Sequence, residues 1–205
     1  MRISDLAKIS GTPVPTIKFY VREGLLPPGR PTGRNQAEYG EAHITRLRLI
    51  RVLTGIGRLN LSSVREVIGA LDNKGLTMGA QCRATIRALF AEMPEHEVAA
   101  SESVRTRVNE FVDGLGWDVD CDSPGRVTLA VVLAALHRLG DPVDVDVFAP
   151  YAEAAAELAR FEMQLFTGDA SNLVARTVLL EAAFAAMRRM AQERHLARQL
   201  GLVGD

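Results

Sequence analysis

Apolar residues recur every three or four positions along most of the chain, which is the spacing of one face of an α-helix. Runs that alternate apolar and polar residues, which are typical of strands, are nearly absent. We therefore expect an all-α protein. The elements are short near the N-terminus and longer in the rest of the chain.

The first 24 residues predict two short helices joined by a turn. Ser4 is expected to cap a helix over Asp5–Ser10, which ends at Gly11. The segment Thr12–Pro15 allows a tight turn, and a second helix follows over Thr16–Glu23. Two helices of about two turns each, joined by about four residues, are typical of a helix-turn-helix.

A proline- and glycine-rich segment over 27–34 follows and is predicted to be an exposed basic loop. A third helix is expected over about Glu41–Gly55. A fourth is expected near Leu61–Leu71, because Asn60 is well suited to cap its first turn.

Longer helices are expected beyond residue 75, near Met78–Met93, Val98–Leu115, Pro124–Leu139, Val145–Phe166 and Ser171–Leu200. The last of these would be about 45 Å long if it is continuous. Between Thr177 and Met187 it contains a single charged residue, Glu181. We therefore expect the middle of this helix to be buried on most sides.

The distribution of charge separates the two parts of the chain. The formal net charge of -1 over 205 residues would by itself argue against a nucleic-acid partner. Residues 1–75 carry 12 Lys and Arg against six acids, whereas residues 76–205 carry 12 against 19. A basic first part joined to an acidic second part is the asymmetry expected of a DNA-binding domain joined to a part with a different role.

The second predicted helix carries the strongest functional motif. Ile17 and Val21 are four residues apart and face inward. The flanks and the outer face then carry Thr16, Lys18, Tyr20 and Arg22. Lys and Arg bind phosphates or guanine edges, and hydroxyls suit phosphate oxygens, so this helix is a candidate recognition element. A charged helix that only faces solvent is the plainer alternative.

At these residues the chain resembles the MerR family of transcriptional regulators. The motifs that carry the resemblance are the segment 3–11, Thr16–Tyr20, Gly24–Pro27, Tyr39 and Val64–Val67. They occur in order over about residues 1–72. The resemblance implies a winged helix-turn-helix DNA-binding domain with a small two-stranded wing over 1–72, followed by a helical dimerisation or effector domain over 76–205. It also implies a homodimer on inverted repeats in double-stranded DNA, with RNA polymerase as a partner at the promoter.

The resemblance also assigns roles to single residues. It gives Lys18 the base-contacting position, Tyr20 a phosphate contact and Tyr39 the anchor of the wing. The sequence departs from the family pattern at Pro13, Pro15, Val21 and Ala37.

Ala37 replaces a phosphate-binding arginine of the wing, and Arg30 and Arg34 are the candidates to supply that charge instead. The segment Asn35–Tyr39 is similar to an actinobacterial-type branch with a helical C-terminal part.

Metal sensing and catalysis find no support in the sequence. Cys82 and Cys121 lie 39 residues apart without a nearby pair of histidines, so no metal or cofactor is predicted. The acidic segment Asp118–Asp122 imitates the start of a calcium loop, but Ser123 and Leu129 stand where Gly and Glu are required. Because no catalytic arrangement of residues stands out, we expect that the protein is not an enzyme.

Aromatic and methionine side chains are concentrated after residue 75. The candidates to line a pocket for an apolar small-molecule effector are Trp117, Phe148, Tyr151, Phe161 and Met187. The resemblance supports this hypothesis, because multidrug sensors of the family line a pocket in this way. Packing in a helical core is the stronger alternative, since helical domains need such side chains in any case.

The longest stretch without Asp, Glu, Lys or Arg is Val127–His137, 11 residues. A bilayer requires about 20 apolar residues, so we expect no membrane partner and a cytoplasmic protein. Two other functions stay open. The chain could be an architectural DNA-binding protein without a ligand, or a small-molecule-binding module.

Overall fold

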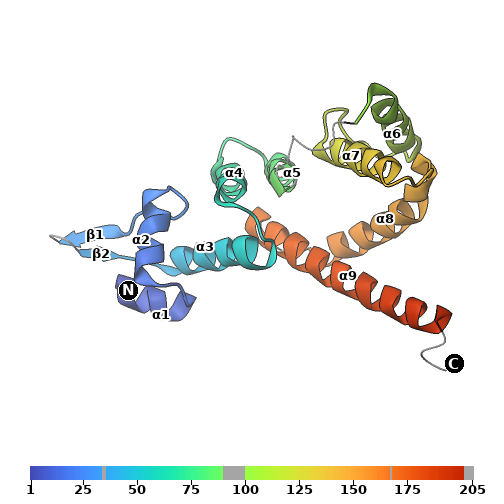
Figure 1. Ribbon diagram of the computed structural model, residues 1–205. Coiled ribbons are helices and arrows are strands. Elements are labelled where there is room, and N and C mark those ends of the chain that lie inside the picture. The colour runs from blue at the N-terminus through green and yellow to red at the C-terminus, as the bar shows by residue number, and fades with distance from the viewer. Residues whose placement is uncertain (34–35, 90–99, 167, 201–205) are drawn as a thin grey trace. The chain divides into compact units, whose positions relative to one another are not determined.

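The computed structural model describes residues 1–33, 36–89, 100–166 and 168–200. These residues form helices and one small two-stranded sheet (Figure 1), as the sequence predicts. The helices are α1 Ile3–Ser10, α2 Val14–Arg22, α3 Glu41–Arg51, α4 Leu61–Asp72, α5 Met78–Leu89, α6 Glu102–Gly114, α7 Pro124–Arg138, α8 Ala149–Gln164 and α9 Ala170–Gln199. The strands are β1 Arg30–Gly33 and β2 Gln36–Glu38. A π-helical segment, η1, covers Val52–Ile56, and a 3₁₀ turn, η2, covers Val145–Phe148.

The chain divides into two compact units. The first contains residues 1–85 together with α9, and the second contains residues 86–168. This division differs from the predicted boundary at residues 72–76. The reason is that the first turns of α9 pack against η1, which places the last helix with the N-terminal elements.

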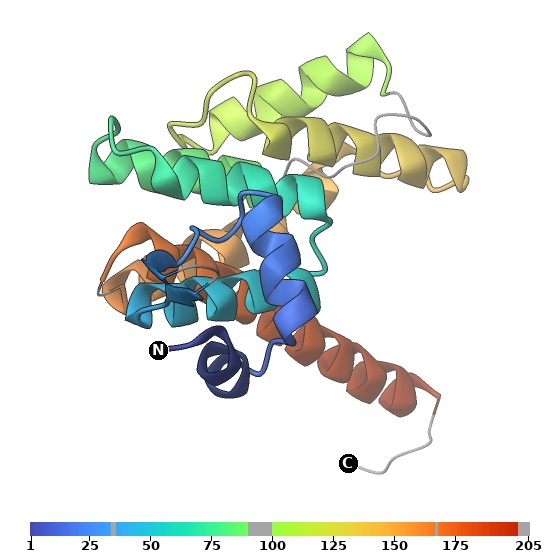
Figure 2. The same ribbon diagram turned by 90° about the vertical axis from the view of Figure 1, so that its left-hand side faces the viewer.

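In the N-terminal unit, α1 packs against α2 and α3 (Figure 2), and these three helices contribute to an apolar cluster. Its buried members are Leu6, Ile17, Leu26, Tyr39, Ile44 and Leu47. The prediction that Ser4 caps α1 is wrong. The helix begins at Ile3, and the carboxylate of Asp5 instead accepts a hydrogen bond from the backbone nitrogen of Arg2 at 3.2 Å. Asn60 does cap α4, because its side chain accepts from the nitrogens of Ser62 and Ser63.

The last helix is exposed where the sequence predicted burial. Its first turns bury Leu173, Val174 and Val178. Beyond them, Phe184 is 40% exposed and Met187 is 55% exposed. The expectation of a buried middle is therefore wrong for the single chain, because η1 covers only the beginning of the helix.

The same helix, Ala170–Gln199, is long and apolar enough to cross a membrane by length and composition alone. Its most apolar window has a mean hydropathy of 1.2 and is 22% buried. This window contains Arg176 and Glu181, and charged side chains inside a bilayer are costly.

The second unit has its own core, in which α6, α7 and η2 meet. Val108, Val112 and Leu133 pack there with Phe148, which lies 6.4 Å from Phe111 between ring centroids. The predicted helix over Val145–Phe166 is divided, because the 3₁₀ turn η2 precedes Pro150 and the α-helix starts at Ala149. Of the predicted helix Met78–Met93, residues 90–93 lie outside the described residues.

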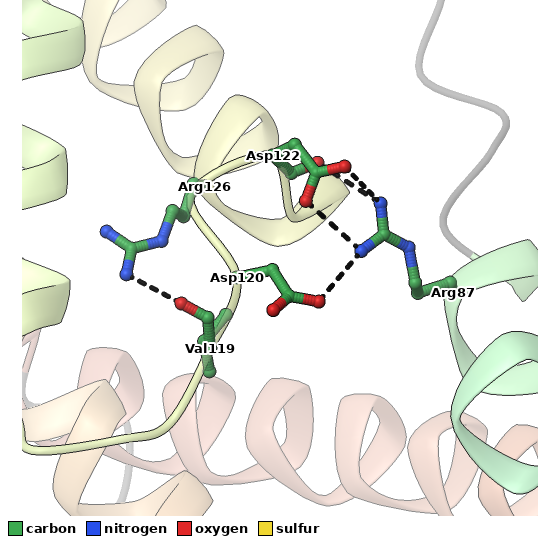
Figure 3. Close-up of polar contacts among 5 residues, drawn as sticks. All are labelled: Arg87, Val119, Asp120, Asp122 and Arg126. Carbon is green, nitrogen blue, oxygen red and sulfur yellow. Dashed lines mark hydrogen bonds and ion pairs between the residues drawn. The ribbon is translucent and has the colours of Figure 1, made fainter. Parts of the chain in front are cut away.

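Arginines fix the loop between α6 and α7 (Figure 3). Arg126, 6% exposed, donates to the carbonyl oxygens of Asn109 and Val119 at 3.1 and 2.9 Å and to the carboxylate of Asp113 at 2.6 Å. Arg87 binds the carboxylate of Asp122 at 3.0 Å. This hydrogen bond, together with the charge of Arg87, holds the pKa of Asp122 below its ordinary value.

Candidate DNA-binding surface

The outer face of α2 presents two cationic side chains. Ile17 is fully buried on the inner face, which fixes how the helix is rotated about its axis. Lys18 and Arg22 are exposed and lie one helical turn apart. Thr16 and Tyr20 are half-buried on the other flank. The structure therefore presents Lys18 and Arg22 more fully to solvent than the two hydroxyl-bearing residues.

Both ends of α2 are fixed by local sequence. Pro15 lies within the first turn, where its missing N–H costs no helical hydrogen bond. At the other end Gly24 has φ 73°, a left-handed conformation that favours glycine. The next two nitrogens, of Leu25 and Leu26, donate to the carbonyl oxygen of Tyr20 at 2.9 and 3.1 Å. Since Leu25 and Leu26 are buried, they secure this end of the helix to the core.

The two strands form an antiparallel hairpin beside α2 (Figure 1). Arg30 pairs with Glu38 and Pro31 with Ala37 in the register of the hairpin. The side chain of Arg30 is exposed, and Arg34 lies outside the described residues. At the base of the hairpin, the nitrogen of Tyr39 donates to the carbonyl oxygen of Met1 at 2.9 Å. The hairpin is thus the predicted wing, held against the start of the chain.

Tyr39 connects the wing to the core. Its side chain is 9% exposed and meets the ring of His43 edge-on, at 5.1 Å between centroids. The burial fits the anchoring role that the sequence predicted and leaves little of the ring for direct contact with DNA. Gly29 makes this packing possible, because a Cβ there would lie 2.9 Å from Cζ of Tyr39 and 3.0 Å from the carbonyl oxygen of Glu38.

Gly29→Ala is expected to lower the free energy of unfolding by about 1 to 3 kcal/mol, because the added methyl group displaces the Tyr39 ring or the wing backbone. Gly33→Ala in the same hairpin is the control, since no atom lies within 4 Å of a Cβ there. Thermal unfolding followed by circular dichroism measures both variants. Equal melting temperatures for the two would contradict the packing argument.

A carboxylate lies among the cations of the surface. Glu23 accepts from Arg22 at 3.4 Å and from Arg65 of α4 at 3.1 Å. Arg22 also lies over the ring of Phe19, 5.3 Å from its centroid. Within the described residues, Lys18 makes no ion pair. Sequence reasoning missed the contact between Glu23 and Arg65, because 42 residues separate them and no local pattern joins them.

The candidate effector residues differ in burial and belong to both compact units. Phe148 is 8% exposed and belongs to the core of the second unit. In the same unit, Trp117, Tyr151 and Phe161 are 40%, 53% and 55% exposed. Met187 lies on α9, in the first unit. An effector pocket formed by all five stays a prediction.

Comparison with known proteins identifies the first part of the chain. Residues 1–71 match the MerR HTH family regulatory protein domain. The mercuric resistance operon regulatory protein of Pseudomonas fluorescens is 30% identical over 109 residues, which are 51% of this chain and 74% of that protein. The chain belongs to the MerR family.

Other similar proteins match different lengths of the chain. The ZntR homologue of Haemophilus influenzae is 44% identical over 73 residues, which are 36% of this chain and only 53% of that regulator. The putative transcriptional regulator SCO5550 of Streptomyces coelicolor A3(2) has 34% identity, a TM-score of 0.73 and full coverage of both chains. The chain is therefore similar to DNA-binding transcriptional regulators over its first part, and its structural likeness to SCO5550 includes the helical C-terminal part.

Proposed function

We propose that the protein acts as a homodimer that recognises an inverted repeat near a promoter. Each copy would place the outer face of α2 in the major groove and its wing on the flanking phosphates. The observation that carries this proposal is the pair of exposed side chains, Lys18 and Arg22, on a helix whose opposite face is buried. An α-helix fits the major groove, where lysine and arginine read guanine edges.

The proposed contacts differ in kind. Lys18 makes the base contact, and Arg22 together with the hydroxyls of Thr16 and Tyr20 contacts phosphates. Arg30 and Arg34 supply the positive charge of the wing, and Tyr39 positions that wing from the core. We assign the DNA-binding role to residues 1–72, and dimerisation or effector binding to residues 76–205. Cytoplasmic location and contact with RNA polymerase at the promoter are part of the same proposal.

An apolar small molecule is the proposed effector, with Trp117, Phe148, Tyr151, Phe161 and Met187 as candidate contacts. The exposure of Tyr151 and Phe161, each more than half accessible, supports a binding role for these two rings. The alternative is an architectural protein that coats DNA without sequence preference. The net negative charge of residues 76–205 argues against such coating, because non-specific binding depends on positive charge.

Lys18→Ala is expected to weaken binding to the upstream DNA of the protein's own gene by about 10- to 100-fold and to change binding to scrambled DNA much less. Arg22→Ala should weaken both and reduce the slope of log K against log salt by about 1. Fluorescence anisotropy across a salt series measures these effects. Arg105→Ala in α6 is the matched control, because Arg105 is an exposed arginine of the second unit.

If the wild type binds scrambled and upstream DNA equally, the architectural alternative replaces the proposed regulator. If both α2 variants bind as tightly as the Arg105→Ala control, the contact assignment is wrong.

A further inference from the structure

Helix α9 carries an apolar face that the single chain leaves uncovered. After the buried first turns, the exposed fractions are 38% at Leu179, 40% at Phe184, 55% at Met187 and 59% at Met190. Monomeric proteins rarely expose a continuous apolar patch of this kind, and such patches mark interaction surfaces. Figure 1 shows that α9 continues as one helix over its whole length.

Met187 and Met190 belong to a stripe of residues with the spacing of a helix-pairing seam. The stripe consists of residues that are three and four positions apart in turn, namely Leu180, Ala183, Met187, Met190, Arg194 and Ala197. Steps of this kind place side chains on one stripe of a helix, and that stripe packs against a second helix in a coiled coil. Leu179 and Phe184 flank the stripe. The opposite side carries Arg189 and Gln192, so the C-terminal half is apolar on one face and not all round.

We propose that this seam of α9 pairs with α9 of a second copy in antiparallel orientation. The inference rests on the proposed homodimer and identifies its contact. The distribution of charge favours this orientation. The half after Met187 carries four arginines and Glu193, whereas the half before it carries only Arg176 and Glu181. Parallel pairing would bring the arginine-rich halves together, whereas antiparallel pairing sets each against the nearly neutral half of the other copy.

The antiparallel pair also gives a useful spacing of the DNA-binding surfaces. If Met187 of one copy lies opposite Met190 of the other, the buried residues in the first turns of the two α9 helices are separated along the helix axis by about 47 Å at Leu173 and about 32 Å at Val178. These are the turns that dock on η1, at the end of α3. Successive major-groove faces on one side of DNA are about 34 to 36 Å apart. The separations at Leu173 and Val178 lie on either side of this spacing, so the pairing separates the two docking points by about one turn of DNA.

Met187→Glu in the full chain tests the contact. We expect the dimer dissociation constant to rise by at least about 100-fold, because each copy then brings a carboxylate, which loses its hydration, against the apolar side chain of Met190 of the second copy. Leu196→Glu is the matched control, since Leu196 is 56% exposed on the opposite side of α9 and should leave the constant unchanged. Sedimentation velocity measures association, and circular dichroism verifies that both variants keep the wild-type helix content.

The orientation is tested by disulfide formation in chains that carry Cys82→Ser and Cys121→Ser. Met190→Cys lies close to the two-fold axis of the antiparallel pair and should cross-link readily on oxidation. Ala197→Cys lies far from the same residue of the second copy and should not cross-link. Equal cross-linking at both positions would mean a parallel pair and would overturn the proposed orientation.

The outcomes separate this inference from the proposed function. A wild type that is dimeric, with a Met187→Glu variant that is equally dimeric, overturns the α9 contact and leaves the homodimer standing. A wild type that is monomeric while bound to DNA overturns both.

A lipid bilayer is the competing occupant of the face. Pelleting of the wild type with phosphatidylcholine–phosphatidylglycerol vesicles, abolished by Met187→Glu, would replace the second copy with a membrane. The Lys18→Ala variant should lose DNA affinity and remain a dimer.

Discussion

Arg126→Ala is expected to lower the free energy of unfolding of the second unit by about 2 to 4 kcal/mol. The guanidinium is 6% exposed and donates to the backbone oxygens of Asn109 and Val119, so its removal leaves two carbonyls without these donors. It also leaves a cavity between α6 and the start of α7. The ion pair with Asp113 contributes less, because that carboxylate is 68% exposed and stays solvated when the arginine is lost.

Urea unfolding followed by tryptophan fluorescence measures this loss. Trp117 is the only tryptophan of the chain and lies in the loop that Arg126 holds, so its signal reports on the second unit. Arg105→Ala is the control, because its pair with Glu102 is exposed and is worth less than about 1 kcal/mol. Arg126→Met should recover part of the loss by refilling the cavity. Equal midpoints for Arg126→Ala and Arg105→Ala would show that the buried guanidinium does not hold the loop.

Features that depend on a few neighbouring residues could be predicted from the sequence. The cap at Asn60, the proline in the first turn of α2 and the glycine after its end each act over two to four positions. The inward face of α2 was also predictable, because Ile17 follows helical spacing and is buried in the structure. For the same reason Lys18 and Arg22 were placed outward.

Features that depend on contacts between distant residues could not be predicted. Nothing near Gly29 in the sequence shows that the ring of Tyr39 will lie against it. Arg126 has the sequence context of a surface arginine, and only the fold brings three oxygen groups around it. The same limit explains the error at Met187. An apolar stretch signals that a surface will be covered, but it does not say whether the cover belongs to the same chain.

Gly57→Ala is expected to lower the free energy of unfolding of the first unit by about 2 to 3 kcal/mol. A Cβ at this position would lie 2.7 Å from the carbonyl oxygen of Leu53 and 2.8 Å from Cγ1 of Val178 on α9. The backbone there has φ -69°, so the cost is steric and involves no change of conformational region. Because the oxygen belongs to η1, it cannot move without disturbing the π-helical turn, and α9 would have to shift off its docking site.

Circular dichroism at 222 nm during urea unfolding, read against the fluorescence of Trp117, tests this prediction. The ellipticity midpoint should fall while the Trp117 midpoint stays constant, because Gly57 and Trp117 belong to different compact units. Gly55→Ala is the control, since Gly55 lies in the same segment with no atom within 4 Å of a Cβ. Adding Val178→Ala to Gly57→Ala should recover only part of the loss, because the contact with Leu53 remains. Full recovery in the double variant would mean that the whole loss of stability comes from the contact with Val178 on α9. An unchanged midpoint for Gly57→Ala alone would show that the packing of α9 does not need a glycine at this position.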